Sequence, residues 1–245
     1  MRPPLFLLAS ALALAAPAAA ETILVVGDSH TVGAFGAHID DALRAVKGNR
    51  VATYGVCSSR PQSYLSESAH GCGHVFRDFD KKPPAKWLGS RVYKELRKVK
   101  GADKEVQMVK TPELGQLLTD HTPGVVIVAL GSNIPINGAS VTKTLAMIHK
   151  AGAACLWVGP PNMRRPTKDE VDEVYATLAK NKVDASVTPE AAKKDSCKLI
   201  DSREYSYLRY PEKDGDGTHY MGKLTPLAAK WGDDAAAAAI KALAP

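Results

Sequence analysis

Short apolar runs alternate with amphipathic segments along most of the chain. The runs are compact and predict strands at 23–26, 50–56, 124–130, 153–158 and 198–201. After the first run, Phe35, Ile39 and Leu43 recur at helical spacing, which predicts a helix over residues 32–47. Further helices are predicted at 112–120, at 140–151, from Thr167 onward and at 224–243, the last interrupted near Gly232.

This alternation predicts an α/β fold with a parallel sheet and helices on both of its faces. The run 124–130 is nearly all apolar, as expected of a central strand. Residues 57–111 do not fit the alternation, because they contain several prolines and many Ser and Gly residues. We treat this stretch as an insertion, and long excursions of this kind often form binding loops or lids.

The N-terminus has the pattern of a signal peptide. An apolar stretch over residues 5–16 follows Arg2 and ends at Pro17 and three alanines. We expect cleavage before Glu21, removal of residues 1–20, and a single domain over residues 21–245. An uncleaved anchor is the alternative, although the stretch is short for a membrane helix. The mature chain is then expected to be periplasmic or secreted, without a transmembrane segment.

Charge argues against nucleic acid as a partner. The formal net charge is +6 in 245 residues, of which 24% are charged and 6% aromatic. Basic and acidic residues are interspersed, with no block of five like charges. A nucleic-acid-binding chain is expected to gather its Lys and Arg on one face or to interleave them with aromatics. The oligomeric state is left open.

Export would permit disulfides between the four cysteines. Of three possible connectivities we favour Cys57–Cys72, the simplest local pairing, and Cys155–Cys197. The second pairing follows if the strand order is the flavodoxin-like 2-1-3-4-5, because the two cysteines then lie at neighbouring strands. Buried free thiols remain an alternative for that second pair.

Two metal sites can be considered and are disfavoured. A zinc site would draw on a cluster of possible ligands that contains no CxxC pair: Cys57, His70, Cys72 and His74. The run around Asp214 and Asp216 suggests a calcium loop, but it lacks the required Gly and Glu positions. We therefore expect neither a metal nor a cofactor.

Candidate catalytic groups follow the strands. Ser29 comes directly after the first strand in Gly-Asp-Ser-His, where a tight turn would expose its hydroxyl. Far along the chain, Asp216 precedes His219 by three residues, so that the carboxylate could orient the imidazole. A serine needs such a base to become a nucleophile. Asp28 is interpreted as stabilising the turn.

An acyl-transfer site also needs donors for the developing oxyanion. Gly55, at the end of the second strand, could offer its backbone N–H to a ligand. Asn133, just after the third strand, could offer its side-chain amide. With the N–H of Ser29 these would form an oxyanion hole of three donors.

Gly27-Asp28-Ser29, Gly55, Gly131-x-Asn133 and Asp216-x-x-His219 together resemble the four blocks of the SGNH, or GDSL-type, hydrolase superfamily. The resemblance runs in order over nearly the whole mature chain. It implies a flavodoxin-like three-layer α/β/α sandwich and metal-independent hydrolysis of esters or thioesters. It also implies a catalytic triad of Ser29, Asp216 and His219, and an oxyanion hole of Ser29, Gly55 and Asn133.

The chain departs from the family pattern in places. His30 replaces the leucine of GDSL, and Ile134 replaces an aspartate that commonly follows the asparagine. Thr31, where the last glycine would stand, disfavours the Gly-x-Ser-x-Gly elbow of α/β-hydrolases. Other residues were considered for the cleft or for substrate contact, with packing as the alternative: His30, His70, His74, Arg60, Tyr64 and Trp87.

The leading hypothesis is an exported serine esterase that removes small acyl groups, most plausibly O-acetyl, from carbohydrate. A lipid esterase or thioesterase is the nearest rival, although the insertion is polar where an apolar groove would be needed. An O-acyltransferase would use the same acyl-enzyme, resolved by a sugar hydroxyl instead of water. A catalytically silent glycan-binding module is the third alternative.

Overall fold

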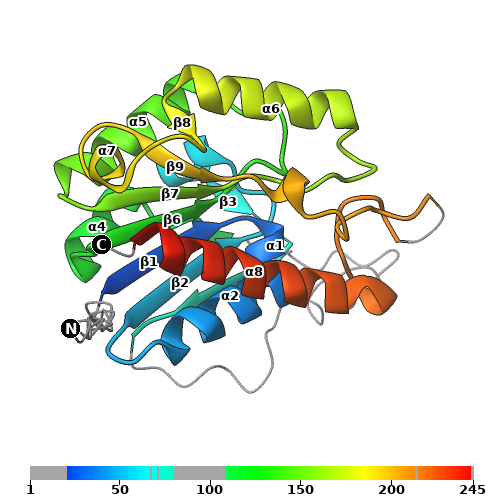
Figure 1. The fold of residues 1–245 in the computed structure, drawn as a ribbon, viewed down its shortest axis with the longest axis horizontal. Helices are drawn as coiled ribbons and strands as arrows, with labels where there is room; N and C mark the ends of the chain where they lie inside the picture. The colour runs from blue at the N-terminus through cyan, green and yellow to red at the C-terminus, as the bar shows by residue number, and fades with distance from the viewer. Residues whose placement is uncertain (1–20, 67, 71, 80–108, 213–214, 244–245) are drawn as a thin grey trace, which may run out of the picture.

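The computed structural model describes residues 21–66, 68–70, 72–79, 109–212 and 215–243. Its centre is a seven-stranded sheet in the order β4-β2-β1-β6-β7-β9-β8 (Figure 1). The strands are β1 (Thr22–Gly27), β2 (Arg50–Val56), β4 (His74–Arg77), β6 (Val125–Ala129), β7 (Ala154–Val158), β8 (Val183–Asp184) and β9 (Cys197–Ile200). All neighbouring pairs are parallel except β2 and β4, which are antiparallel.

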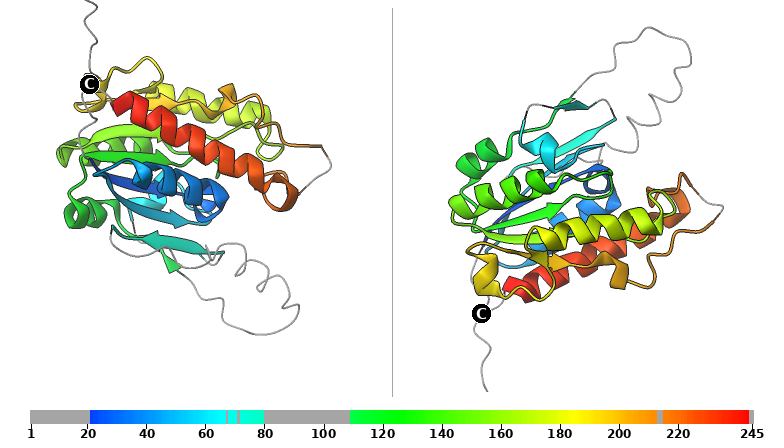
Figure 2. Two further views of the ribbon diagram at one scale, coloured as in Figure 1. Left: turned by 60° about the horizontal axis from the view of Figure 1, so that its bottom comes forward. Right: turned by 90° about the horizontal axis from the view of Figure 1, so that it is seen from above.

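Helices cover the sheet on both faces, so the chain forms a three-layer α/β/α sandwich and the predicted fold class is confirmed (Figures 1 and 2). On one face α2 (Ala34–Ala45) packs against α8 (Thr225–Leu243). The other face carries α4 (Leu114–His121), α5 (Gly138–Lys150) and α6 (Lys168–Lys180). Short elements complete the fold: α1 (Ser29–Val32), α7 (Pro189–Ala192), η1 (Pro61–Tyr64), η2 (Ser202–Glu204) and η3 (Gly222–Leu224).

The five strands expected from the sequence keep the order 2-1-3-4-5, as β2-β1-β6-β7-β9. The observed order differs because two short edge strands, β4 and β8, extend the sheet at its ends. β8 has only two residues, and β4 lies within the stretch 57–111 that the sequence led us to treat as an insertion. The insertion contributes β4 and also a separate two-stranded sheet of β3 (Ala69–His70) and β5 (Val109–Lys110).

Two helix predictions need correction. The first helix is divided at Gly33 into α1, which begins at Ser29, and α2. The last helix is not interrupted near Gly232 but continues to Leu243. A Cβ on Gly232 would lie 2.5 Å from the carbonyl oxygen of Phe35, so this glycine lets α8 approach the backbone of α2 closely. It is a packing residue, where the sequence suggested a helix break.

The register of the parallel strands aligns the carboxyl ends of β1, β2 and β6. Gly27 lies opposite Gly55 in β2 and opposite Ala129 in β6. The residues that follow these three strands therefore emerge together at the carboxyl edge of the sheet, where open α/β sheets bind ligands. Every residue of β6 and β7 is buried, which makes this edge a rigid support.

Both favoured cysteine pairs form disulfides. Cys155 and Cys197 lie on the neighbouring strands β7 and β9 and are fully buried. Cys57 follows β2 and is joined to Cys72, which precedes β4. These bonds leave neither Cys57 nor Cys72 as a thiolate ligand, contrary to the zinc alternative. In the described part of the chain, no helix has the length and apolar character needed to cross a membrane.

Candidate active site

Ser29 is the first residue of α1, at the exit of β1. Asp28 caps this helix by accepting a hydrogen bond from the N–H of His30 at 3.0 Å, so it stabilises the turn. The turn is tight: a Cβ on Gly27 would lie 1.9 Å from Oγ1 of Thr31. Only glycine fits at this position without moving α1. The tight turn places Ser29, which is partly exposed, at the carboxyl edge of the sheet.

The structure brings Ser29 together with His219 and Asp216, from the other end of the chain. Nε2 of His219 lies 2.8 Å from Oγ of Ser29, and Nδ1 lies 2.7 Å from Oδ2 of Asp216. A carboxylate at Nδ1 favours the tautomer with the proton there. The lone pair of Nε2 then faces the hydroxyl of Ser29, as a general base requires.

Asp216 is held in its charged form. Partial burial alone would raise the pKa of Asp216, but hydrogen bonds from the ring and the N–H of His219 and from the N–H of Thr218 outweigh it and lower the pKa to about 2. At neutral pH the carboxylate is therefore ionised. It can orient the His219 ring and stabilise the imidazolium formed during proton transfer.

The loop that carries Asp216 and His219 is fixed from outside. The hydroxyl of Tyr210 donates to the carbonyl of His219 at 3.0 Å. The carbonyl of Gly217 accepts hydrogen bonds from the N–H groups of Arg164 and Arg165, at 3.0 and 2.9 Å. Gly217 has a φ of 92°, in the left-handed region that favours glycine. These contacts preserve the distance from His219 to Ser29.

Asn133 lies at the same edge, after β6. Its Nδ2 donates to the carbonyl oxygen of Ser59 at 3.0 Å, and Ser59 in turn donates its hydroxyl to the carbonyl of Gly27 at 3.1 Å. The loops after β1, β2 and β6 are thus connected by hydrogen bonds. An amide nitrogen carries two hydrogens, so one N–H of Asn133 remains for a ligand.

Gly55 is placed less favourably for the role predicted from the sequence. It lies within β2, opposite Val75 of the antiparallel strand β4. Two residues later, the N–H of Cys57 donates to the carbonyl of Gly73 in the same ladder. Because antiparallel bonding repeats every second residue, the N–H of Gly55 also faces β4 rather than the edge of the sheet. A Cβ at Gly55 would lie 3.0 Å from the backbone of Thr31, so packing against α1 accounts for this glycine.

Ser58 is a further candidate donor, which the sequence did not lead us to expect. It follows β2 directly and has a φ of 63°, which is unusual for a residue other than glycine. Its N–H has no hydrogen-bond partner among the described residues. The only sequence indication was its position just beyond the end of a strand.

The structure also shows the surroundings of other residues considered from the sequence. Tyr64 is buried, and its hydroxyl donates to the carbonyl of Gly27, so it packs the insertion against β1 instead of facing a ligand. Two further histidines have partners of their own: His38 pairs with Asp233 on α8, and His121 contacts Tyr54. Burial lowers the pKa of His70 and of His74, with a further contribution from Arg60 at His70. Trp87 and Asp214 lie outside the described residues.

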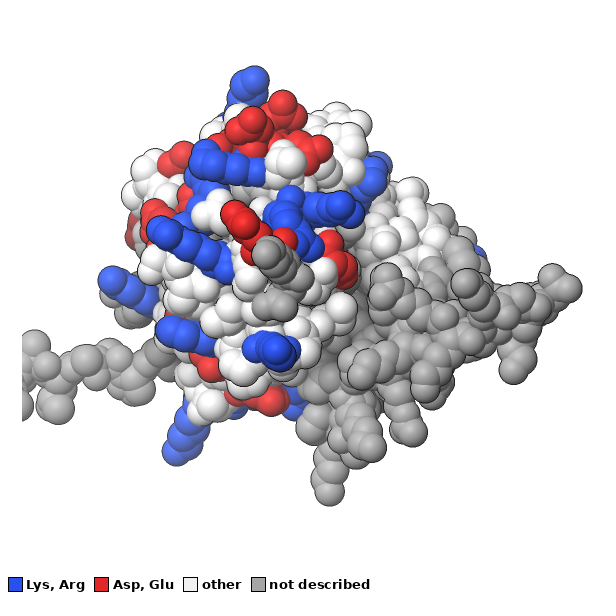
Figure 3. Space-filling view, turned by 90° about the vertical axis from the view of Figure 1, so that its right-hand side faces the viewer, with Lys and Arg blue, Asp and Glu red and all other residues white. Residues whose placement is uncertain are grey.

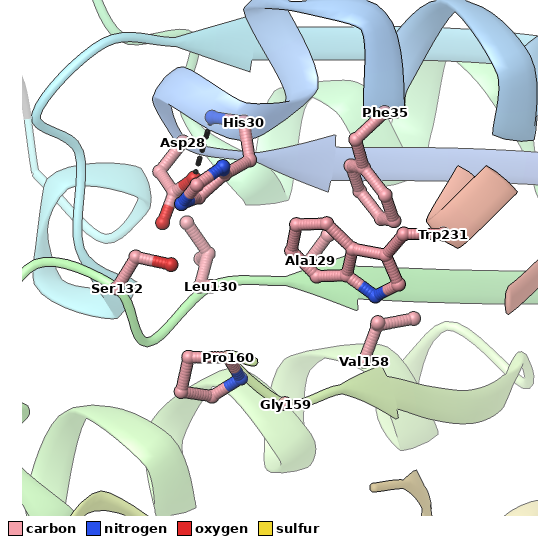
Figure 4. Close-up of a pocket in the computed structure, with 10 residues that line it drawn as sticks. All are labelled: Asp28, His30, Phe35, Ala129, Leu130, Ser132, Val158, Gly159, Pro160 and Trp231. Atoms are coloured by element: carbon pink, nitrogen blue, oxygen red, sulfur yellow. Dashed lines mark hydrogen bonds between the residues drawn. The ribbon is translucent and has the colours of Figure 1, made fainter. Parts of the chain in front are cut away.

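A small cavity adjoins the nucleophile turn (Figure 4). His30 lines it and is buried, with its ring centroid 5.5 Å from that of His219. Burial, and then the charge of His219, lower the pKa of His30 to about 3. Burial raises the pKa of Asp28 to about 6, despite opposing hydrogen bonds and the nearby His219. His30 is thus a neutral ring beside the candidate base.

Charges of both signs surround this edge of the sheet. Figure 3 shows the face at the carboxyl ends of the strands, where Lys and Arg side chains are interspersed with Asp and Glu. Met221, two residues after His219, is exposed, and Phe76 on β4 is the other exposed large apolar side chain of the described chain. The described rim is therefore mainly polar.

No protein-family profile and no curated protein matches the chain. Several solved structures resemble the chain. One is the psychrotrophic esterase EstA from Pseudoalteromonas sp., inhibited by monoethylphosphonate. It has 12% sequence identity and a TM-score of 0.46, and the match covers 90% of this chain and 98% of that chain. TesA has 15% identity, coverages of 89% and 99%, and a TM-score of 0.47. A DUF4886 family protein from Bacteroides uniformis has 10% identity, coverages of 90% and 94%, and a TM-score of 0.41. All three likenesses are weak.

Proposed function

We propose that this chain is a serine esterase in which Ser29 is the nucleophile, His219 the general base and Asp216 the residue that orients it. The observation that carries the proposal is the continuous hydrogen-bonded series from Asp216 Oδ2 through His219 to Oγ of Ser29, at 2.7 and 2.8 Å. A serine, an imidazole and a carboxylate in this geometry are the elements of nucleophilic acyl transfer.

The reaction follows from these positions. Oγ of Ser29 attacks the ester carbonyl carbon while Nε2 of His219 takes the hydroxyl proton. The tetrahedral intermediate collapses, the bond to the alcohol oxygen breaks, and the imidazolium gives its proton to that oxygen. A water molecule then attacks the acyl-enzyme, His219 takes one of its protons, and Ser29 leaves with that proton as the acid is released.

Negative charge on the carbonyl oxygen would be stabilised by hydrogen-bond donors at the same edge. The N–H of Ser29 and the second N–H of Asn133 are two such donors, and the N–H of Ser58 is the third in place of Gly55. Donors fixed in advance act most strongly because they need no reorganisation during the reaction. The contact from Asn133 to Ser59 supplies this rigidity.

As substrate we propose small acyl esters, chiefly O-acetyl groups on carbohydrate outside the cytoplasm. The polar rim supports a sugar more than a lipid, which would require a broad apolar groove. The two disulfides fit an oxidising compartment. The expected signal peptide points the same way, although residues 1–20 lie outside the described part of the chain.

The proposal is tested by hydrolysis of p-nitrophenyl acetate, butyrate and octanoate by the protein and by the variants Ser29→Ala and His219→Ala. We expect acetate to be the best substrate and each variant to lose at least about a thousandfold in kcat. Ser186→Ala and His38→Ala are matched controls, because these residues are exposed and lie away from the site.

If no test ester is hydrolysed, a covalent active-site label shows whether Ser29 is nevertheless the nucleophile. A fluorophosphonate should add covalently to Ser29, as read by mass spectrometry of the peptide, and should not add to Ser29→Ala. Full activity in Ser29→Ala, or labelling of another serine, would contradict the proposal. Acetate transferred to a glycan without release of free acetate would instead identify an acyltransferase.

A further inference from the structure

The cavity beside the nucleophile turn combines an apolar wall with a polar end. Phe35, Leu130, Val158, Pro160 and Trp231 supply apolar surface. Asp28, His30 and Ser132 supply polar surface, and Figure 4 shows these three side chains gathered on one side. The space is small, close to the minimum that holds one water molecule.

Two buried polar atoms at this cavity lack a partner. Oδ2 of Asp28 and Nε2 of His30 have no hydrogen bond among the described residues, and both side chains are more than nine-tenths buried. Ser132 lies close enough to Asp28 to lower the pKa of Asp28, but it does not reach Oδ2 with hydrogen-bond geometry. A buried polar group left without a partner is destabilising, so a bridging partner would be favoured.

His30 also contacts the candidate base. Its ring lies 5.5 Å from that of His219 and 5.2 Å from that of Trp231, where the two planes meet edge to face. His30 is therefore held between the indole on α8 and the imidazole that must face Ser29. A leucine, as in the GDSL pattern, could fill similar space but could not bond to water.

We propose that this cavity holds one ordered internal water that bridges Asp28 Oδ2 and His30 Nε2, and that His30, fixed in this way, positions the ring of His219. The second part rests on the proposed function; the first does not. The water accepts from one neighbour and donates to the other, so it satisfies both buried atoms. His30 does not touch the substrate and acts through His219.

Crystal structures of the protein and of His30→Leu test the water directly. We expect density within hydrogen-bond distance of both Asp28 Oδ2 and His30 Nε2 in the protein, and none in His30→Leu. Ser29→Ala should keep the water, because it leaves the cavity wall unchanged. A cavity without ordered density in the unmodified protein would overturn the water site, whatever the activity proves to be.

Kinetics and melting of His30→Leu and His30→Gln test the positioning role. We expect both variants to fold. In His30→Leu, kcat should be lowered on the order of ten- to a hundredfold, with KM nearly unchanged. Gln can still bond to the water, so it should recover part of this loss. Unchanged kcat in a well-folded His30→Leu would show that His30 only fills space, and would leave the roles of Ser29 and His219 intact.

Discussion

The side-chain amide of Asn133 donates to the carbonyl oxygen of Ser59 at 3.0 Å, and this bond joins the loop after β6 to the loop after β2. The two residues are 74 positions apart in the chain. The bond fixes the orientation of the amide, because its carbonyl oxygen must point away from Ser59. The direction of the second N–H is thereby fixed before any substrate binds.

We predict that Asn133→Ala lowers kcat by about a hundred- to a thousandfold, the usual effect of removing one oxyanion donor. The measurement is the rate of p-nitrophenyl acetate hydrolysis, with thermal melting to show that the variant is folded. Asn181→Ala is the matched control, since its amide also donates to a backbone carbonyl but lies at the end of α6. Equal loss in both variants would argue for a general structural effect.

Asp28 should make the protein less stable as the pH rises. Its pKa is about 6 in the folded chain, against about 4 for an unperturbed Asp, because the carboxyl is buried. The folded state then binds more protons than the unfolded state between these values. The contribution of Asp28 to the free energy of unfolding should therefore fall by about 2–3 kcal/mol from pH 4 to pH 6 and level off above. His30, whose pKa is lowered to about 3, contributes in the opposite direction, so the effect of Asp28 is measured as a difference between the protein and a variant.

Asp28→Asn tests this dependence, because asparagine keeps an acceptor for the N–H of His30 and cannot ionise. Urea titrations at pH 4, 5, 6 and 7 should show the variant becoming more stable than the protein as the pH increases. A difference between the two that does not change with pH would mean that Asp28 has no raised pKa.

The two disulfides should differ in their response to reductant. Cys155 and Cys197 are 0% exposed, whereas Cys72 is partly accessible. Mild dithiothreitol followed by alkylation and peptide mass spectrometry should label Cys57 and Cys72 first. Simultaneous labelling of all four cysteines would indicate global unfolding instead.

Loss of Cys57–Cys72 should also weaken the site. The bond closes a loop of about 15 residues and would contribute roughly 3 kcal/mol in the chain-entropy model. It also anchors the turn that carries Ser58 and Ser59. The double variant Cys57→Ser with Cys72→Ser is therefore expected to be less stable in urea and to have a lower kcat.

Gly232→Ala should destabilise the protein, although alanine is the better helix former. Its Cβ would lie 2.5 Å from the Phe35 carbonyl and 2.9 Å from the Ile39 nitrogen, both backbone atoms of α2. We expect a loss of about 1–3 kcal/mol in urea unfolding. Gly115→Ala in α4 is the control: its Cβ would meet only the flexible end of Met147, at 3.2 Å, so no comparable loss is expected. A stabilised Gly232→Ala would contradict this packing.

The sequence alone determined the α/β/α class, the order of the five main strands and the strand ends at which Ser29 and Asn133 lie. These features depend on local periodicity, on the apolar character of the runs, and on the rule that parallel strands share a carboxyl edge. Ser29, Asp216 and His219 could be named because their motifs are short and local, although the distances between them could not.

Only the tertiary structure decided the remaining features. The N–H of Gly55 turns toward β4, a strand inside the stretch treated as an insertion, and Gly232 fits a close contact between two helices. In the sequence, His30 is only a departure from the GDSL motif, yet in the structure it is buried between His219 and Trp231. Each of these depends on which residues, far apart in the chain, are packed within a few ångströms, and no local pattern encodes that packing.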